Sequence, residues 1–338
     1  NMGKNSAAAV LILKTMCVCI LLRELRTAAR CSAPVASGLM NGRWHGRFRL
    51  NMKLPDYNAP SALAAVLDEH GFGMQKKFGQ NFLINAHIRQ ELISALGLSA
   101  GTTVWEVGPG LGSMTSLLLE AGADLTVFEI DRGFVQLLTS YFGSYHSFHL
   151  IEGDVLKTWK AEYQRHAPKA FFGNLPYNIA AKLIAATIEA ECFFNRMVIT
   201  VQKEVGLRMT AAPGSADYSS FSVLCQWAYD VEPIRDIAPA AFWPKPNVES
   251  RALRFTKKQS PQPVRDARLF LTLVRGLFAA RRKTVKNNLS TILAARGKKT
   301  LSAETLLKDA RIDPAARAES LTVYDFIRLS DILAACDE

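Results

Sequence analysis

The sequence lacks the patterns that would place it among several common protein classes. Its six cysteines, at positions 17, 19, 31, 192, 225 and 336, form no CxxC pair, so we expect neither a disulfide framework nor a zinc site. The most apolar stretch, 7–22, is interrupted by Lys14 and Thr15 and is short for a membrane span. There is no internal repeat and no Ser-His-Asp arrangement. These absences favour a protein of the reducing cytoplasm.

Acidic residues are scarce in two segments of the 338-residue chain, whose net charge is +11. Residues 1–51 carry eight Lys or Arg and one acid, Glu24. Residues 257–299 carry twelve Lys or Arg against Asp266 alone. The rest of the chain is therefore net acidic, and the second segment is a basic patch. Such a patch suits a nucleic-acid backbone, although a merely solvated basic helix would have the same composition.

Residues 1–51 are open to three interpretations. They are an extension that is disordered or not native, an organellar transit peptide, or a signal or anchor segment. The Arg-rich, acid-poor composition suits a transit peptide, whereas Met52 would be a natural start. We favour the extension and do not expect a membrane protein.

The most informative motif is Asn174-Leu175-Pro176-Tyr177, which follows the apolar run Phe171-Phe172-Gly173. An exocyclic amine on a base is a poor nucleophile, so a catalyst must localise its lone pair. The side-chain oxygen of Asn174 and the main-chain carbonyl of Leu175 would accept the two amine protons, with Pro176 fixing the backbone. Tyr177 would offer an aromatic face to the base. The alternative is a strand followed by a Pro turn with a packed Tyr.

A nucleotide-binding pattern lies upstream of this motif. A predicted strand over 102–107 runs into Gly108-Pro109-Gly110-Leu111-Gly112 and then a predicted helix over 113–121. Glycines allow close approach of the backbone, and a helix N-terminus offers free N–H groups. Glu129 ends a second predicted strand, 125–130, at a distance typical of an acid that binds ribose hydroxyls. The GxGxG spacing, unlike GxGxxG, favours a ligand without phosphates. The alternative is an ordinary glycine turn.

A third predicted strand, 148–151, leads into Gly153-Asp154. Asp154 would accept a hydrogen bond from an adenine amine, and the N–H of Val155 would complete the base contact. The alternative for Asp154 is an Asx turn or a helix cap. In a doubly wound α/β sheet, ligands bind beyond the carboxyl ends of the strands. We therefore expect Gly108, Glu129, Asp154 and Asn174 to meet at one crevice.

Taken together, the motifs resemble those of the small-subunit ribosomal RNA adenine N6-dimethyltransferases. The shared motifs are Lys76-Lys77-Phe78-Gly79-Gln80-Asn81-Phe82-Leu83, the GPGLG loop, Glu129, Gly153-Asp154, Asn174 to Tyr177, the run 242–250 (FWPKPNVES) and Arg281-Arg282-Lys283-Thr284. The resemblance covers about residues 74–335. Two positions depart from the usual pattern, since Trp243 replaces a frequent Tyr and Glu249 a frequent Asp.

The resemblance implies a class I methyltransferase fold, Rossmann-like, with a smaller α-helical C-terminal domain. It implies S-adenosylmethionine as cofactor and dimethylation of two adjacent adenosines in the 3′-terminal hairpin loop of 16S rRNA, within the small ribosomal subunit or its precursor. The resemblance implies that six positions contact the cofactor or border its pocket, namely Asn81, Leu83, Gly108, Glu129, Asp154 and Asn174. We also expect cofactor contacts at Gln80, Gly110, Ile130 and Val155. We expect a monomer that needs no metal.

We expect a methyltransferase domain over 52–258 and a helical, basic rRNA-binding domain over 259–338. Val274, Phe278, Val285, Leu289 and Ile292 recur near helical spacing and predict a helix with one packed face. The other side would present the proposed RNA contacts, which are Arg275, Arg281, Arg282, Lys283 and Lys286.

The Pro-rich run 242–247 reads as a loop. Phe242 would stack on the target base opposite Tyr177, unless its ring is buried against its own loop.

Three other functions stay open. One is the same chemistry on large-subunit rRNA, as in macrolide-resistance methyltransferases, which the basic motif at 281–284 disfavours. Another is a noncatalytic RNA-binding assembly or transcription factor on this fold, disfavoured by intact Asn174 and Glu129. The third is a dehydrogenase, disfavoured by the glycine spacing.

Overall fold

The computed structural model describes residues 53–71, 81–175, 177–259, 263–298 and 300–336. These residues belong to one compact unit, 50–338. The predictions about residues 1–51 fall almost wholly outside this unit and outside the described residues, so they stay predictions. The same is true of Gln80 and Pro176.

The described residues form a seven-stranded sheet in the order β4-β3-β2-β5-β6-β9-β7. The five parallel strands are β2 (Thr103–Val107), β3 (Asp124–Glu129), β4 (Phe148–Glu152), β5 (Ala170–Asn174) and β6 (Arg196–Gln202). Two antiparallel strands, β9 (Ser250–Lys257) and β7 (Tyr229–Ile237), complete the far side. The strand order reverses between β2 and β5, which is where a doubly wound sheet binds its ligand.

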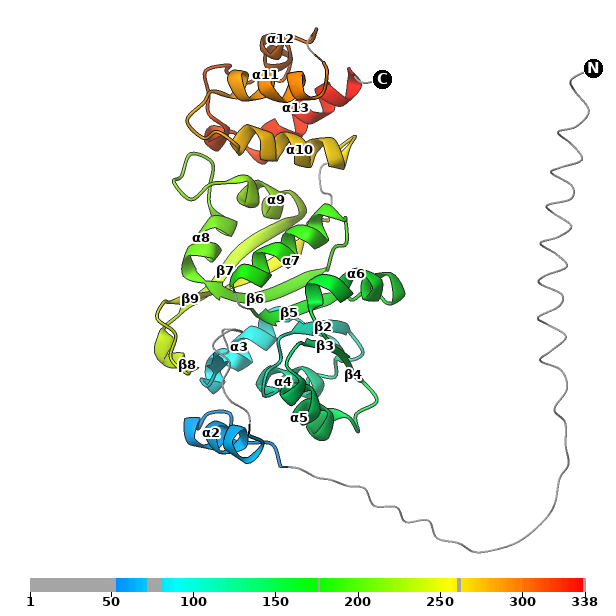
Figure 1. The fold of residues 1–338 in the computed structure, drawn as a ribbon, viewed down its shortest axis with the longest axis vertical. Helices are drawn as coiled ribbons and strands as arrows, with labels where there is room; N and C mark the ends of the chain where they lie inside the picture. Colours follow the sequence, from blue (N-terminus) through cyan, green and yellow to red (C-terminus); the bar gives the residue numbers. More distant parts are fainter. Residues whose placement is uncertain (1–52, 72–80, 176, 260–262, 299, 337–338) are drawn as a thin grey trace, which may run out of the picture. The chain divides into compact units, whose positions relative to one another are not determined.

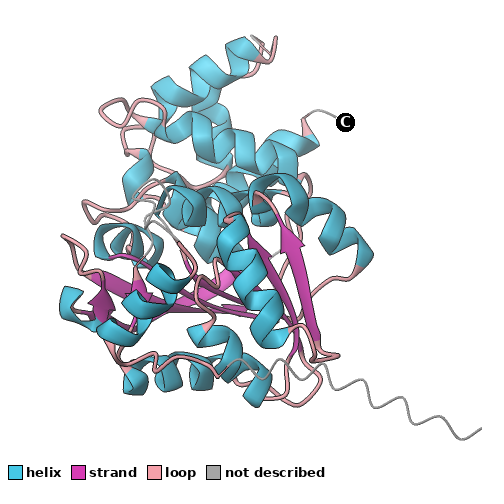
Figure 2. Ribbon diagram, turned by 60° about the horizontal axis from the view of Figure 1, so that its bottom comes forward, coloured by secondary structure: helices cyan, strands magenta, loops and turns pink. Residues whose placement is uncertain are grey.

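The central strands β2, β5 and β6 are buried on both faces because helices cover both faces of the sheet (Figure 2). In β6, Met197, Ile199 and Val201 belong to one buried cluster, while Val198 belongs to the other. Such unbroken apolar strands are typical of buried parallel sheets. The covering helices are α3 (Ala86–Leu96), α4 (Ser113–Glu120), α5 (Arg132–Phe142), α6 (Val155–Arg165), α7 (Tyr177–Glu189), α8 (Lys203–Thr210) and α9 (Ser220–Ala228).

A second, two-stranded sheet joins distant parts of the chain. β1 (Phe82–Leu83) pairs antiparallel with β8 (Phe242–Trp243), which follows a short 3-10 helix, η2 (Pro239–Ala241). Before β1, helix α2 (Pro60–Glu69) starts with Pro in its first turn, where no N–H bond is lost. Its buried Leu63 and Leu67 join the same cluster as Leu83.

Helices gather at the C-terminal end of the described unit (Figure 1). They are α10 (Ala267–Phe278), α11 (Val285–Ala295), α12 (Ala303–Asp309) and α13 (Val323–Ala335), with a 3-10 turn, η3 (Ala318–Ser320). Their buried residues, such as Leu273 and Leu333, belong to the same cluster as Phe171 and Phe255 of the sheet. A helical C-terminal region is therefore present, and apolar packing attaches it to the rest of the unit. The boundary at 258/259 stays a prediction.

The single helix predicted through residues 274–292 is wrong. The chain turns between α10 and α11, because buried Asn288 donates its side-chain N–H groups to the carbonyls of Leu277 (2.9 Å) and Ala280 (3.2 Å). The Thr284 hydroxyl caps the start of α11 by accepting from the N–H of Asn287. The motif at 281–284 therefore lies in a turn, and periodicity alone could not reveal these caps.

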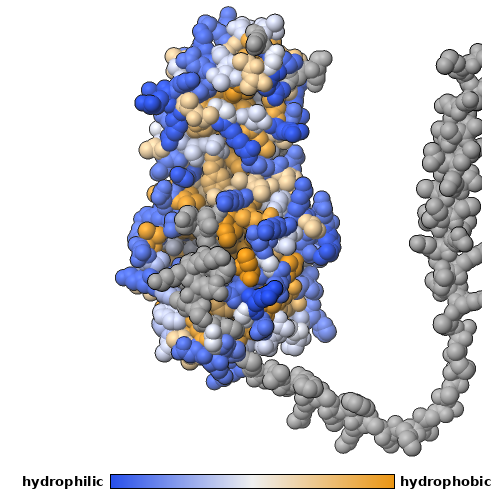
Figure 3. All heavy atoms as spheres, in the orientation of Figure 1, coloured by the Kyte–Doolittle hydropathy of each residue, from blue (hydrophilic) through white to orange (hydrophobic). Residues whose placement is uncertain are grey.

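The surface of this unit is mixed. In Figure 3, hydrophilic residues are spread over the visible face, with hydrophobic ones between them. Among the described residues, none of the helices has the length and hydropathy needed to cross a bilayer.

Candidate active site

A cavity lies beyond the carboxyl ends of β2, β3, β4 and β5. Its empty space, counted together with the open mouth, is about 960 Å³. The sequence-predicted residues that line it are Asn81, Leu83, Gly108, Gly110, Glu129, Ile130, Asp154, Val155, Asn174 and Leu175. Residues separated by more than 90 positions in the chain thus meet at one edge of the sheet.

The glycine loop depends on backbone conformations that other residues rarely adopt. Gly108, Gly110 and Gly112 have φ of 70°, 56° and 85°, in the left-handed region where a side chain is strained. A Cβ atom at Gly112 would lie 2.6 Å from the ring of Phe142, whereas one at Gly108 would meet nothing within 4 Å. Gly112 therefore serves packing, and Gly108 leaves open space at the cavity wall.

Glu129 ends β3 with its carboxylate buried and its side chain 5% exposed. One oxygen accepts from the N–H groups of Ile130 (2.8 Å) and Asp131 (2.9 Å), and the other accepts from Gly110 (3.2 Å). Burial raises the pKa of Glu129, and these three N–H groups oppose that shift. A carboxylate has about four acceptor positions, so it is fixed in place and retains capacity for a ligand hydroxyl.

Asp154 caps a helix and also lines the cavity, while its contact with an adenine amine stays a prediction. One carboxylate oxygen accepts from the N–H of Leu156 (3.0 Å) and caps α6, as the alternative interpretation proposed. The residue also lines the cavity, and its second oxygen has no partner among the described residues. The cap therefore fixes the carboxylate at the cavity wall.

Glu106 is a site residue that the sequence analysis missed. It lies in β2, is 2% exposed and lines the cavity. The Thr115 hydroxyl donates to one of its carboxylate oxygens (2.7 Å). Burial raises the pKa of Glu106 to about 8, and nearby Glu129 adds to the shift. The available signal was an acid inside the apolar strand Thr-Val-Trp-Glu-Val, directly before the glycine loop.

The side-chain amide of Asn174 has a defined orientation. Its Nδ2 donates to the main-chain carbonyl of Asn81 at 3.0 Å, so Oδ1 is left as the acceptor for a ligand. The N–H of Leu175 donates to the carbonyl of Thr200 in β6 (3.2 Å) and holds the motif at the strand end. Tyr177 begins α7, and its contact with a base stays a prediction.

Phe242 is buried, with 4% of its surface exposed. It lies opposite Leu83 in the β1–β8 pair, belongs to the core cluster around α3 and α4, and is not among the residues that line the cavity. Its neighbour Trp243 stacks on Phe82, which does line the cavity. This position favours the alternative that the Phe242 ring is packed within the protein, and stacking on a base stays a prediction.

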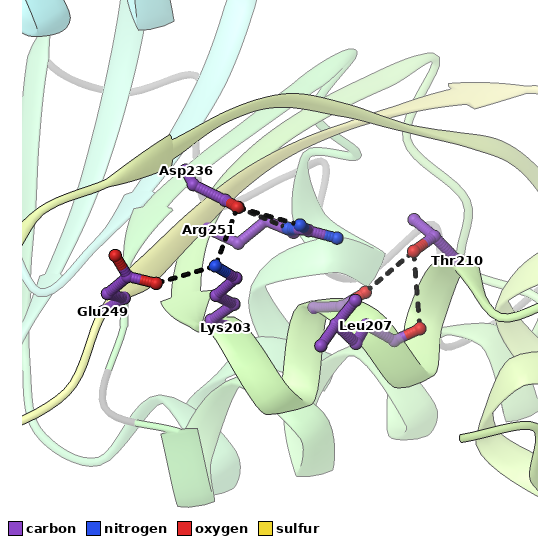
Figure 4. Close-up of polar contacts among 7 residues, drawn as sticks. Lys203, Leu207, Thr210, Asp236, Glu249 and Arg251 are labelled. Atoms are coloured by element: carbon purple, nitrogen blue, oxygen red, sulfur yellow. Dashed lines mark hydrogen bonds and ion pairs between the residues drawn. The ribbon is translucent and has the colours of Figure 1, made fainter. Parts of the chain in front are cut away.

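A cluster of charges follows the carboxyl edge of the sheet beyond β6 (Figure 4). Lys203 Nζ lies 2.7 Å from Glu249 and 3.1 Å from Asp236, and Arg251 forms two bonds with Asp236. These bonds, those from Arg251 foremost, lower the pKa of Asp236 to about 2. The cluster links the start of α8 to the loop that precedes β9. Because Lys203 is partly exposed and Glu249 is half-exposed, their bond stabilises the fold only modestly.

The predicted RNA contacts fall into two groups. Arg275 pairs with Glu189, Arg281 pairs with Glu319 (3.0 Å), and Lys286 pairs with Glu304 (2.5 Å). Arg282 and Lys283 are exposed in the turn between α10 and α11 and have no side-chain partner among the described residues. The acids that pair with three of these cations come from other elements, and contact of all five cations with RNA stays a prediction.

Comparison with known proteins agrees with this geometry. The profile of the family described as ribosomal RNA adenine dimethylase matches residues 71–332. The chain belongs to this family. Proteins called ribosomal RNA small subunit methyltransferase A are similar to it. The one from Treponema pallidum (strain Nichols) is 51% identical over 84% of this chain and 99% of that protein. The one from Treponema denticola is 49% identical over 82% and 96%.

Solved structures support the fold of this adenine dimethylase. A dimethyladenosine transferase from Plasmodium falciparum has a TM-score of 0.62 at 22% identity, covering 72% of this chain and 94% of that one. The 23S rRNA methyltransferase ErmE has a TM-score of 0.56 at 20% identity, covering 75% and 99%. The predicted family and the predicted α/β methyltransferase fold are both confirmed.

Proposed function

We propose that this protein is an S-adenosylmethionine-dependent rRNA adenine N6,N6-dimethyltransferase. Its substrate is the pair of adjacent adenosines in the 3′-terminal hairpin loop of 16S rRNA, in the small ribosomal subunit or its precursor. The observation that carries the proposal is the Asn174 amide, which the Asn81 carbonyl orients at the rim of a cavity that also contains Glu129. Family membership and relatives named for the small subunit support it.

The cavity fits the cofactor by its charge. Its described lining residues include no Lys or Arg and the acids Glu129 and Asp154, together with a third acid, Glu106, whose pKa of about 8 leaves it largely protonated at neutral pH. Such a lining favours a ligand that carries positive charge and no phosphates. S-adenosylmethionine, when bound, supplies a methyl group activated on a cationic sulfur. The same lining argues against a dinucleotide and hence against the dehydrogenase alternative.

The residues around the cavity have distinct roles in this proposal. Glu129 holds the ribose hydroxyls, and Asp154 with the N–H of Val155 holds the adenine of the cofactor. Gly108 allows the cofactor to approach the backbone, and Ile130, which is 45% exposed, covers it at the mouth. Asn81, Leu83 and Gly110 complete the wall, and Gln80 is proposed on the resemblance alone.

Catalysis follows from the position of Asn174 beside this wall. Its Oδ1 and the carbonyl of Leu175 would accept hydrogen bonds from the two N–H groups of the target amine, which localises the nitrogen lone pair on the side of the cofactor. One amine proton would leave to solvent for each methyl group gained. Fixed acceptors of this kind act where charge changes in the transition state. Pro176 and Tyr177 would hold that carbonyl and stack on the base. The product of one transfer is still an amine with one proton, so a pocket that admits one methyl group can act twice.

RNA recognition is assigned to the C-terminal helical region. Arg282 and Lys283 are the first candidates for phosphate contacts, because they are exposed and unpaired among the described residues. The three paired cations, Arg275, Arg281 and Lys286, would contact phosphates only after their ion pairs with glutamates break. We propose a cytoplasmic monomer with a methyltransferase domain over 52–258 and an rRNA-binding domain over 259–338. A target in an RNA loop is splayed out at lower cost than one in a duplex.

The decisive experiment is primer extension on 16S rRNA from cells that lack this protein. The dimethyladenosine stop should disappear, and the wild-type gene should restore it. Asn174→Ala should lower the methylation rate by about 10²- to 10³-fold, with binding of small subunits unchanged. Asn195→Ala, an exposed residue before β6, is the matched control. An unchanged stop without the protein would refute the function, and a stop on 23S rRNA would favour the large-subunit alternative.

A further inference from the structure

The segment before the family match is attached to the cofactor cavity. Residues 53–70 precede the matched region, 71–332, and contain Tyr57 and helix α2. The Tyr57 hydroxyl donates to the main-chain carbonyl of Leu111 at 3.0 Å. Leu111 lies inside the glycine loop. The segment therefore contacts the loop whose glycines line the cavity, in a bond between residues 54 positions apart.

Arg89 of α3 holds the same segment from the other side. Its Nη1 donates to the carbonyls of Tyr57 (3.1 Å) and Leu83 (2.8 Å), and its Nη2 donates to the side-chain oxygen of Asn58 (2.8 Å). The guanidinium also lies over the Tyr57 ring, 5.9 Å from its centre. Arg89 is 6% exposed, and all three of these acceptors are neutral.

An arginine that is buried with only neutral hydrogen-bond acceptors loses hydration free energy and gains no ion pair in return. Desolvation lowers the pKa of Arg89, and the nearby charge of Asp56 opposes that shift. Because an arginine remains protonated, its charge is buried with no hydrogen-bonded carboxylate among the residues that the structure describes. Buried charges are weak evidence for stability and better evidence for a required geometry. Here the geometry concerns β1, because the Leu83 carbonyl that Arg89 holds belongs to a strand that lines the cavity.

The glycine loop needs such external attachments. Gly108, Gly110 and Gly112 all have positive φ, and glycine loses more conformational freedom on ordering than any other residue. A hydrogen bond to Leu111 in the middle of the loop restricts its alternatives. Restriction before the ligand arrives lowers the entropy lost on binding.

We propose that residues 54–69 form a strap that preorganises the cofactor site, with Tyr57 and Arg89 as positioning residues. Tyr57 fixes the glycine loop, and Arg89 fixes the strap to β1, whose neighbour Asn81 orients Asn174. Neither residue touches the reacting atoms. The proposal rests on the proposed cofactor cavity and adds a part of the chain that the family match does not include.

The test compares two tyrosines that make the same kind of bond. Tyr57→Phe removes the bond to Leu111, and Tyr163→Phe removes a bond of equal type to the carbonyl of Phe193 (2.9 Å), away from the cavity lining. Calorimetry with S-adenosylhomocysteine should show about 3- to 10-fold weaker binding for Tyr57→Phe and wild-type binding for Tyr163→Phe. In steady-state assays, Tyr57→Phe should raise KM for S-adenosylmethionine and leave KM for small subunits unchanged.

Arg89→Lys is the second variant. It keeps the charge, but its single ammonium nitrogen lacks the planar fork by which two nitrogens of Arg89 reach the three acceptors. Its loss of affinity should therefore exceed that of Tyr57→Phe. Hydrogen exchange measures the same coupling from the other site. If α2 and its segment affect cofactor binding, cofactor binding must also affect the stability of α2. S-adenosylhomocysteine should slow the exchange of α2 amides in the wild-type protein and slow it less in Tyr57→Phe.

The outcomes separate this proposal from the proposed function. If the wild-type protein binds S-adenosylhomocysteine and Tyr57→Phe binds it with the same affinity, the proposal of a strap is overturned and the proposed function is not. Equal weakening by Tyr57→Phe and Tyr163→Phe would also overturn it, because the effect would then follow overall stability. Absence of binding by the wild-type protein would overturn the cofactor assignment, and the strap with it.

Discussion

The cofactor cavity and the turn between α10 and α11 are both sites proposed from short sequence motifs. They differ in whether the folded protein leaves the predicted side chains available to a ligand. At the cavity, side chains from four strand ends point to one space, and buried N–H groups fix Glu129. At the turn, acids pair with Arg281 and Lys286 and leave Arg282 and Lys283 exposed. Strand ends converge by sheet topology, whereas the availability of a cation depends on its neighbours in space.

The largest expected effect is a loss of cofactor affinity when Glu129 is replaced, and it tests the cavity side of this comparison. Glu129→Gln keeps one acceptor oxygen and turns an NH₂ group toward backbone N–H donors, so affinity for S-adenosylmethionine should fall by about 1 to 3 kcal/mol. Glu152→Gln is the matched control, because Glu152 ends the neighbouring strand β4 but is exposed and pairs with Arg132. Calorimetry that finds equal affinity in the two folded variants would refute the role of Glu129.

Two double variants that remove the same number of positive charges test whether paired and unpaired cations contribute differently to RNA binding. Arg282→Ala with Lys283→Ala should weaken binding to small subunits by about tenfold and make the slope of log affinity against log salt shallower by roughly two. Arg281→Ala with Lys286→Ala should change both less, because these cations must first leave Glu319 and Glu304. Filter binding across a salt series, with circular dichroism for folding, measures both. Identical slopes would remove the distinction between paired and free cations.

Glu106 allows a test of the cavity by pH. Its folded pKa of about 8 lies above the usual value of a glutamate, so the folded state binds this proton more tightly than the unfolded state does. The resulting stabilisation is complete below about pH 4 and is lost as pH rises through about 8. Relative to Glu106→Gln, the wild-type protein should therefore lose at least about 1 kcal/mol of unfolding free energy between about pH 5 and 8.5. Urea titrations of both proteins measure this, and a constant difference would contradict it.

The smallest expected effect is a gain of RNA affinity. Glu319→Gln should release Arg281, and since exposed ion pairs contribute less than about 1 kcal/mol, affinity should rise about two- to threefold at low salt. Glu162→Gln makes the same change of charge beside Arg165 on α6 and controls for net charge. An equal gain in both variants would show that overall charge, and not the Arg281 pair, sets affinity.

Much of the cavity was predictable because its residues follow a repeated local pattern. Each parallel strand is an apolar run that ends in a glycine or a polar residue, as at Gly108, Glu129 and Asn174, and parallel strands bring such ends to one edge. Glu106 was missed because it lies inside an apolar strand, where an acid is unexpected. The burial of Phe242 was only an alternative, since nothing local shows that residues 242–243 pair with residues 82–83.

The sequence by itself determined the fold class, the family and the residues that meet at the cavity, because apolar periodicity and motif spacing are local properties. Only the tertiary structure decided where the helix at 267–295 breaks, which cations are neutralised, that Tyr57 reaches the glycine loop and that Arg89 joins the Tyr57 segment to β1. Those features depend on contacts between residues 8 to 54 positions apart. Such contacts form when the packed core places the partners together, and no short stretch of sequence encodes them.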